Sequence, residues 1–240
     1  MTALLSVETL SKRFRGLTAV DRVSFAVPAG AIFAVIGPNG AGKTTLFNMI
    51  AGALKPDGGT IEFAGRRLDG LPADAVCRRG VARTFQLMRP FSALSVEDNV
   101  TVGALLRRHD VEAARARAQT LLLRLDLFDK RHRIATTLTL PDRKRLEVAR
   151  ALATEPRLLL LDEVMAGLRP TETDRMVAIL QALNRDGLTI LLIEHVMRAV
   201  MALASHVLVL DHGTAIAEGA PERVVRDPAV VQSYLGAEPM

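Results

Sequence analysis

The feature that most constrains this chain is a glycine-rich segment between an apolar run and a stretch with helical spacing. Its residues are Gly37, Pro38, Asn39, Gly40, Ala41, Gly42, Lys43, Thr44 and Thr45. Glycines allow backbone conformations and close approaches that a Cβ would forbid, so consecutive N–H groups can point at phosphate oxygens. The segment therefore predicts a P-loop that binds ATP, with Lys43 reaching the β and γ phosphates and Thr44 ligating Mg²⁺.

Short apolar segments rich in β-branched residues recur along the chain, and each is followed by a turn or a helical pattern. They cover residues 31–36, 158–161, 189–193 and 207–210. This alternation predicts an α/β fold with a mostly parallel sheet that is covered on both faces. Nearer the amino terminus, the segments 4–10, 23–27 and 60–63 predict a small antiparallel β layer, because turn residues separate them.

Between residues 95 and 153 the pattern changes to Ala-, Leu- and Arg-rich segments with helical periodicity. They cover residues 96–106, 111–127 and 143–153. Such segments predict an α-helical subdomain inserted into the core. The expected organisation is one ATPase domain, residues 1–240, with a P-loop NTPase core lobe. Residues 1–87 and 156–240 form the core lobe, and residues 88–155 form the helical subdomain.

Two carboxylates follow directly after the apolar run 158–161. As the last residue of a buried strand, Asp162 is expected at the carboxyl edge of the sheet beside the P-loop, where it can hold Mg²⁺ through its water shell. Glu163 is then placed to polarise the attacking water as a general base. Apolar strands that end in Asp-Glu also occur by chance, and it is the P-loop that favours the catalytic interpretation.

Two further polar residues follow predicted strands. His195 comes after the strand 189–193 and is expected to contact the γ-phosphate and orient the attacking water, although a lone histidine is more often structural. Gln86 ends a short strand just before the helical segments, where it could sense Mg²⁺ and the γ-phosphate; the alternative is a surface glutamine. Both join Lys43 and Glu163 as catalytic candidates, and Gln86 is also a candidate metal ligand.

Composition limits the remaining classes of protein. The formal net charge is +5, and residues 107–150 hold twelve Lys or Arg against six Asp or Glu. Such a region could favour an anionic membrane surface or nucleic acid, but no series of aromatic residues interleaves the charges to stack bases, which favours solvated helix faces. The single Cys77 cannot form an internal disulfide. We expect neither a secretory signal nor a membrane span, because no apolar run approaches about 20 residues.

Taken in order, the P-loop, Gln86, Asp162-Glu163 and His195 resemble the motif set of ABC-transporter ATP-binding subunits. The resemblance spans essentially the whole chain. It implies that Phe14, which lies 23 residues before Gly37, stacks on the adenine ring. The alternative for this residue is a place in the core.

Finer features resemble the ATPase subunits of branched-chain amino-acid importers. They lie at residues 9–25, 83–86, 149–153, 218–222 and 234–236. The resemblance implies an ATP-hydrolysing subunit that uses ATP and Mg²⁺ at the cytoplasmic face of the inner or plasma membrane, as a peripheral protein. Its implied partners are a second ABC ATPase subunit or its own copy, two transmembrane permeases and, indirectly, a periplasmic solute-binding protein. No nucleic-acid partner is expected.

One segment departs from the family pattern. The family's signature, Leu-Ser-Gly-Gly-Gln or a close variant, aligns with the residues called here the signature segment, Leu138, Thr139, Leu140, Pro141 and Asp142. Thr139 keeps a hydroxyl, whereas Pro141 has no N–H to donate, and the carboxylate of Asp142 is expected to repel ATP unless Arg143 or Lys144 offsets it. The same residues predict a helix start, with Thr139 as N-cap and Asp142 in a capping-box position.

In the family, the signature completes the ATP site of the opposite subunit. The altered signature segment therefore predicts a heterodimer with one intact and one weakened site. Val164 and Arg169, where the family commonly has Pro and Asp or Asn, lie at the same dimer interface. Two alternatives stay open: a soluble ABC ATPase that acts on nucleic acid or ribosomes, and an export or lipid-transport ATPase. The sequence leaves the cargo open among leucine, urea, amides and aromatic acids.

Overall fold

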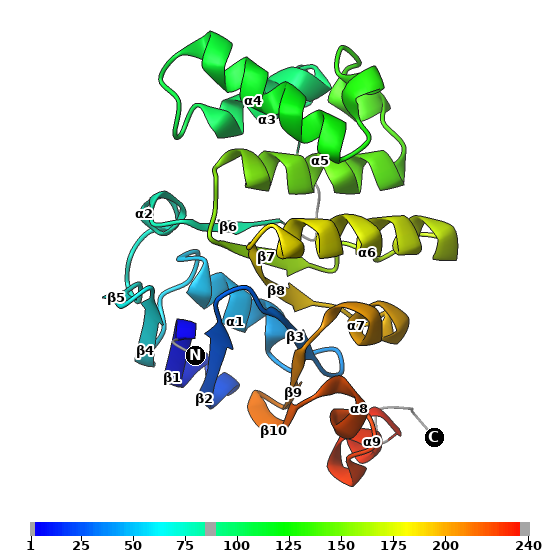
Figure 1. The fold of residues 1–240 in the computed structure, drawn as a ribbon. Coiled ribbons are helices and arrows are strands. Elements are labelled where there is room, and N and C mark those ends of the chain that lie inside the picture. Colours follow the sequence, from blue (N-terminus) through cyan, green and yellow to red (C-terminus); the bar gives the residue numbers. More distant parts are fainter. Residues whose placement is uncertain (1–2, 85–89, 236–240) are drawn as a thin grey trace.

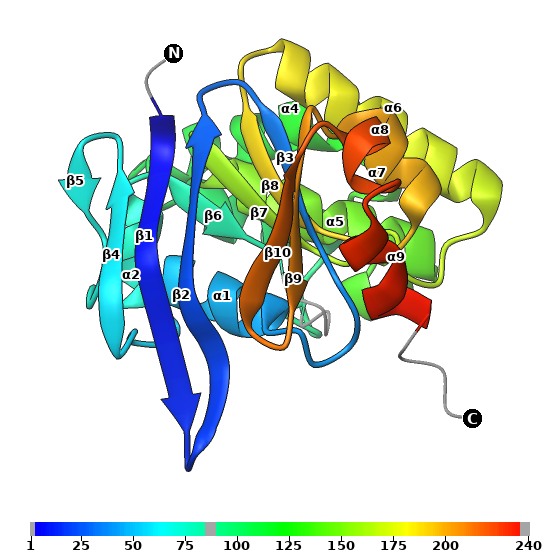
Figure 2. The ribbon, with the colours of Figure 1, turned by 90° about the horizontal axis from the view of Figure 1, so that it is seen from below.

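The computed structural model describes residues 3–84 and 90–235, which form two sheets and a set of helices (Figures 1 and 2). The strands are β1 (Ala3–Phe14), β2 (Leu17–Pro28), β3 (Ile32–Ile36), β4 (Gly58–Phe63), β5 (Arg66–Arg67), β6 (Val81–Arg83), β7 (Leu158–Asp162), β8 (Thr189–Ile193), β9 (His206–Asp211) and β10 (Thr214–Gly219). The α-helices are α1 (Lys43–Ile50), α2 (Ala73–Arg78), α3 (Val96–Ala104), α4 (Val111–Arg124), α5 (Leu140–Ala153), α6 (Pro170–Arg185), α7 (Met197–Leu203), α8 (Pro221–Val224) and α9 (Pro228–Leu235). Two short 3₁₀ helices are η1 (Phe128–Lys130) and η2 (Ala135–Thr137).

The larger sheet has the strand order β10-β9-β3-β8-β7-β6. Neighbours from β9 to β6 pair in parallel, whereas β10 pairs antiparallel with β9. Every residue of β3, β7 and β8 is buried, as expected for strands with helices or a second layer on both faces. The predicted α/β class and mostly parallel sheet are confirmed.

Two hydrophobic cores lie on the two faces of this sheet. Phe33 and Val35 of β3 enter the core shared with α1 and with the antiparallel sheet β2-β1-β4-β5. The alternate residues Ala34 and Ile36 enter the core shared with α5, α6 and α7. Figure 2 shows β1, β2 and β4 on one side of the molecule and α6 and α7 on the other. The sheet whose edge is expected to carry the site is therefore packed on both of its faces.

The helices α3, α4 and α5 gather at one end of the molecule (Figure 1). Ser95 and Asp110 cap α3 and α4, because their side chains accept backbone N–H groups of Asp98 and Ala113 at 3.0 and 2.8 Å. The predicted helices are present, although α5 begins at Leu140 rather than residue 143. The boundaries of the two lobes stay a prediction.

Other parts of the chain differ from the sequence-based expectation. The short strand expected to end at Gln86 is β6, which ends at Arg83, and Gln86 lies outside the described residues. The strand β10 and the helices α8 and α9 follow β9 without having been expected. Among residues 3–84 and 90–235, no helix has the length and apolar character needed to cross a membrane.

Candidate nucleotide-binding site

The P-loop connects the end of β3 to the start of α1, as predicted. Gly37 and Gly42 have φ of 146° and 98°. A Cβ on Gly37 would lie 2.0 Å from the carbonyl oxygen of Leu210, and one on Gly42 would lie 2.2 Å from that of Ala19. Since these contacts are to backbone, no larger residue fits either position without moving a strand. The loop is thus wedged between β2 and β9 and presents its N–H groups before the amino end of α1.

Lys43 is the first residue of α1, and its side chain folds back onto this loop. Its Nζ donates hydrogen bonds to the carbonyl oxygens of Gly37 and Pro38 at 2.7 and 2.8 Å. Burial lowers the pKa of the Lys43 ammonium, and the nearby carboxylates of Glu163 and Asp162 act in the opposite direction. The structure therefore brings the lysine and both predicted carboxylates to one edge of the sheet.

Asp162 is the last residue of β7 and is 1 % exposed. Its Oδ2 accepts a hydrogen bond from Arg83 Nη2 at 2.7 Å. Its Oδ1 is buried and has no hydrogen-bond partner in the part of the chain that the structure describes. Buried carboxylate oxygens are nearly always satisfied, so this acceptor fits a ligand from outside the chain, such as the hydration shell of Mg²⁺. Thr44, in the first turn of α1, is exposed and is the second described residue predicted to hold the ion.

Glu163 begins the turn that follows β7. Its backbone has φ of 50°, a strained value for a residue other than glycine, and its N–H donates to the carbonyl of Ile193 at 3.0 Å. From the segment after β8, His195 places Nδ1 4.0 Å from Glu163 Oε1. The side chain of His195 is 58 % exposed, so a ligand can reach it. The histidine and the carboxylate that were expected at this edge therefore lie close together.

Phe14 lies at the end of β1, beside the tight turn into β2. Its ring is 44 % exposed, and Lys12 Nζ lies 5.6 Å from the ring centroid. The alternative of a core residue does not fit this exposure. Adenine stacking by Phe14 stays a prediction, as do the metal and catalytic roles of Gln86.

Several polar residues near the site were missed at the sequence level. Arg83 binds Asp162; Lys144 of α5 donates to the carbonyl oxygen of Glu163 at 2.9 Å. Glu194, between β8 and His195, is 1 % exposed and accepts the N–H of Met165 at 2.9 Å, and burial raises its pKa. Arg83 ends β6 and Glu194 follows β8, whereas Lys144 lies in α5. A charged residue next to a core strand could have indicated the first two, but no local pattern reveals their partners or the contact of Lys144.

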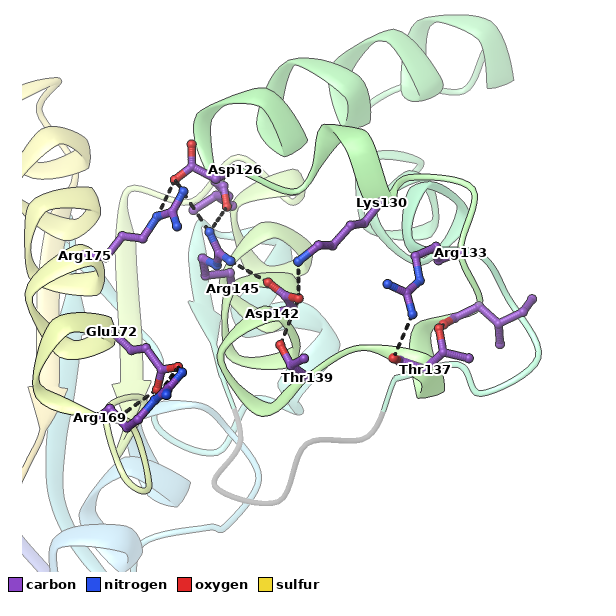
Figure 3. A network of polar contacts seen from close by, with 12 residues as sticks. Asp126, Lys130, Arg133, Thr137, Thr139, Asp142, Arg145, Arg169, Glu172 and Arg175 are labelled. Carbon is purple, nitrogen blue, oxygen red and sulfur yellow. Dashed lines mark hydrogen bonds and ion pairs between the residues drawn. The ribbon is translucent and has the colours of Figure 1, made fainter.

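The signature segment forms a polar network with its neighbours (Figure 3). Thr139 Oγ1 donates to Asp142 Oδ2 at 2.9 Å, and no side-chain hydrogen bond caps the helix. Lys130 and Arg145 each form an ion pair with the same carboxylate. Burial alone would raise the pKa of Asp142, but the hydrogen bonds from Lys130, Thr139 and Arg145 outweigh it and hold that pKa below its usual range.

Two expectations for this segment are therefore corrected. The predicted capping box does not form, because the Thr139 hydroxyl and the Asp142 carboxylate bond to each other rather than to backbone N–H groups. The cations that offset Asp142 are Lys130 and Arg145, not Arg143 or Lys144. The helix start itself is confirmed, with Thr139 at the N-cap and Pro141 in the first turn.

The other two departures from the family pattern also have local roles. Val164 is 3 % exposed and packs in the core that contains α5 and α6. Arg169 precedes α6, and its Nη2 lies 2.8 Å from Glu172 Oε1 (Figure 3). The place of both residues at a dimer interface stays a prediction.

A P-loop, a strand-end aspartate, an adjacent glutamate and a histidine at one sheet edge define a P-loop ATPase of the cassette class. The family model described as "ABC transporter" matches residues 20–166, and a second, described as "Branched-chain amino acid ATP-binding cassette transporter", matches residues 216–239. The chain belongs to the ABC transporter family of ATP-binding subunits.

Individual relatives indicate which type of ABC transporter ATPase this chain resembles. The chain is 42 % identical to the high-affinity branched-chain amino acid transport ATP-binding protein LivG of Salmonella typhimurium, over 97 % of this chain and 98 % of that protein. It is 34 % identical to the lipopolysaccharide export system ATP-binding protein LptB of Escherichia coli, over 98 % of both. A solved ATP-binding cassette of an ABC transporter in its ADP conformation superposes with a TM-score of 0.90 at 30 % identity, covering 98 % of this chain and all of that one. The resemblance to ATPases of the branched-chain importer type is confirmed.

Proposed function

We propose that this chain hydrolyses ATP to power an importer of branched-chain amino acids or a related small polar solute. The observation that carries the proposal is the convergence of Lys43, Asp162 and Glu163 at one sheet edge, in a chain whose tail matches the branched-chain family model. The higher identity to LivG than to LptB favours import over export.

The residues at this edge divide the chemistry of hydrolysis between them. The backbone N–H groups of residues 37–45 and the Lys43 ammonium bind the phosphates, once Lys43 exchanges the loop carbonyls for phosphate oxygens. Glu163 accepts a proton from the attacking water, and His195 orients that water against the γ-phosphate. Thr44 and Asp162 would hold Mg²⁺, which when bound neutralises charge on the β and γ phosphates.

A cleft lined by residues of α2, β6, α3 and α5 is the surface that we assign to a permease. It has a volume of about 280 Å³. Phe91 and Val102 line it and are 45 % and 42 % exposed, and Arg150 lies over the Phe91 ring at 4.9 Å. An apolar floor with a basic edge fits an amphipathic segment of a membrane subunit. This placement supports a peripheral position at the cytoplasmic face of the membrane.

A reconstituted complex tests the function and this surface together. With its permeases and binding protein in vesicles, the chain is expected to drive ATP-dependent uptake of a labelled branched-chain amino acid. Val102→Glu is expected to lower both permease co-purification and uptake by about tenfold, because a docked permease segment would bury the new charge in an apolar contact. Val111→Glu is the matched control, since Val111 is 54 % exposed at the start of α4 and does not line the cleft. Export without uptake, or equal loss in both variants, would contradict the proposal.

The basic region gives no support to the nucleic-acid alternative. Within residues 3–84 and 90–235, at least six of its twelve Lys and Arg residues form ion pairs, several with acidic residues from outside residues 107–150. The paired residues are Arg108, Arg115, Arg117, Arg124, Lys130 and Arg145. The net positive field of this surface is therefore weaker than the sequence count indicates.

We further propose a heterodimer with unequal ATP sites. The Thr139 hydroxyl donates to Asp142, and Pro141 has no N–H, so the signature segment offers few donors to ATP held by an opposite subunit. The site built on Lys43 and Glu163 instead depends on the signature of a different chain. This arrangement supports a second ABC ATPase as partner rather than a second copy.

Steady-state hydrolysis separates the two assemblies. The isolated chain is expected to hydrolyse ATP at less than about one tenth of the rate of the complex with its partner ATPase, because loss of phosphate-binding donors typically costs about 10²-fold or more in rate. Rates are compared per intact P-loop at saturating Mg²⁺ and ATP. A homodimer with the full rate of the complex would rule out unequal sites.

A further inference from the structure

Arg83, the last residue of β6, connects three parts of the nucleotide site. Its Nη1 donates to Asn48 Oδ1 of α1 at 2.5 Å, and its Nη2 donates to Asp162 Oδ2 of β7 at 2.7 Å. The guanidinium carbon lies 5.9 Å from the centroid of the Phe47 ring. The side chains of Arg83 and Asp162 are 7 % and 1 % exposed. The helix after the P-loop and the strand that ends in Asp162 are thus joined through one buried cation.

This contact places a positive charge on the carboxylate that is expected to hold Mg²⁺. In a buried environment, a carboxylate without a counter-charge is costly, so the hydrogen-bonded guanidinium stabilises Asp162, in addition to the electrostatic influence of Lys43 and Lys144. It also engages one of the two carboxylate oxygens, while Oδ1 has no hydrogen-bond partner among the described residues. Arg83 therefore neutralises the same charge that would attract a divalent ion.

We propose that Arg83 is a positioning residue that acts as a built-in counter-ion for Asp162 and thereby weakens Mg²⁺ binding at this site. The inference rests on the proposed function, since it takes Mg²⁺-ATP as the ligand. The pair holds Asp162 in its orientation before nucleotide binds and competes electrostatically with the ion when it arrives. A lower affinity for Mg²⁺ keeps the carboxylate from being occupied in the absence of nucleotide phosphates.

The direction of the effect follows from linkage. Removing the guanidinium raises the free energy of the ion-free state, in which the buried Asp162 loses its hydrogen-bonded counter-charge and keeps only the electrostatic influence of Lys43 and Lys144. The Mg²⁺-bound state loses less, because the ion supplies the missing positive charge. The free-energy difference between the ion-free and the Mg²⁺-bound state is therefore larger in the variant, which means tighter Mg²⁺ binding. If Arg83 only braced the fold, its loss would instead leave Mg²⁺ affinity unchanged or weaken it through a misplaced carboxylate.

The experiment measures binding of a fluorescent ATP analogue to the full chain at fixed nucleotide concentration while Mg²⁺ is titrated. In Arg83→Gln, the Mg²⁺ concentration at half-saturation is expected to fall by about threefold to tenfold relative to the native protein. Arg83→Lys keeps a charge but cannot bridge both acceptors, so its value is expected between the two. Asn48→Ala removes the other hydrogen bond and keeps the guanidinium, and is expected to stay within about twofold of the native value.

Thermal unfolding gives a second readout. Without ligand, Arg83→Gln is expected to unfold about 6 °C or more below the native protein, as for loss of a buried ion pair. The increase in Tm on adding Mg²⁺ and ADP is expected to be larger in the variant than in the native protein.

The outcomes separate the inference from the proposed function. If nucleotide binding to the native protein does not depend on Mg²⁺, the proposed function fails. If the native protein depends on Mg²⁺ and the half-saturating concentration in Arg83→Gln is unchanged or higher, the inference on Arg83 is wrong. If Arg83→Gln does not fold, Arg83→Lys provides the test. A half-saturating Mg²⁺ concentration in Arg83→Lys that equals or exceeds the native one contradicts the inference.

Discussion

Replacement of Glu163 by Gln is expected to lower ATP hydrolysis by about 10²- to 10⁴-fold while nucleotide stays bound. Glutamine keeps the shape of the side chain but cannot accept the proton of the attacking water. The positive φ of Glu163 and its N–H bond to Ile193 depend on the backbone, so the turn should be retained. Steady-state phosphate release from the complex with the partner ATPase, together with nucleotide binding, measures the two effects separately.

A carboxylate elsewhere on the surface provides the control. Glu222 lies exposed in the first turn of α8, and Glu222→Gln is expected to leave the rate within about twofold, as for most surface substitutions. If the unequal-site proposal holds, Glu163→Gln removes nearly all turnover of the complex, because the remaining site relies on the altered signature segment. Residual activity near half of the native rate would show two competent sites instead.

Replacement of Asp142 by Ala is expected to destabilise the protein by about 3 kcal/mol, at the lower end of the range for breaking a buried ion pair. Arg145, 9 % exposed, and Lys130, 35 % exposed, would lose their shared carboxylate. A larger destabilisation is not expected, because Arg145 keeps a contact to Asp126 at 3.5 Å and Lys130 can reach solvent. Urea denaturation of the two proteins measures the difference.

The stabilisation by Asp142 should also depend on pH. Its pKa is lowered in the folded protein, so its ionised form contributes stability above the unfolded-state pKa of about 3.9. That contribution is lost as the pH falls through the folded-state pKa, where the carboxylate becomes protonated in both states. The stability difference between the native protein and Asp142→Ala should therefore be constant from pH 5 to 7 and shrink below about pH 4. A difference that grows on acidification would contradict the ion-pair account.

Local motifs were the part of the site that sequence could predict. The P-loop and the strand that ends at Asp162 are each read from consecutive residues, and parallel strands bring their carboxyl ends to one edge. The cations that offset Asp142 were predicted wrongly, because the prediction considered only the residues directly after it in sequence. Sequence neighbours such as Arg143 point elsewhere on a helix, whereas Arg145, three positions on, shares the face of Asp142.

The remaining features depend on contacts between distant segments. Arg83 and Asp162 are brought together by the pairing of β6 with β7, which no local pattern reports. Lys130 contacts Asp142 from a short 3₁₀ helix, η1, which is too short to show a hydrophobic periodicity in the sequence. The strand β10 continues the sheet in the opposite direction, so the alternation of strands and helices that indicated the parallel part could not indicate it.

The hydrogen bond from Lys144 to the carbonyl of Glu163 has a consequence for kinetics. Lys144 and the last three residues of the signature segment lie in the first turns of α5. In the proposed dimer, nucleotide held by the partner at this end of the helix would therefore also affect the turn that carries Glu163. The two ATP sites of such a dimer would then be coupled. A rate measured for one site includes the occupancy of its neighbour, and titrations of mixed intact and inactivated subunits call for coupled, not additive, binding terms.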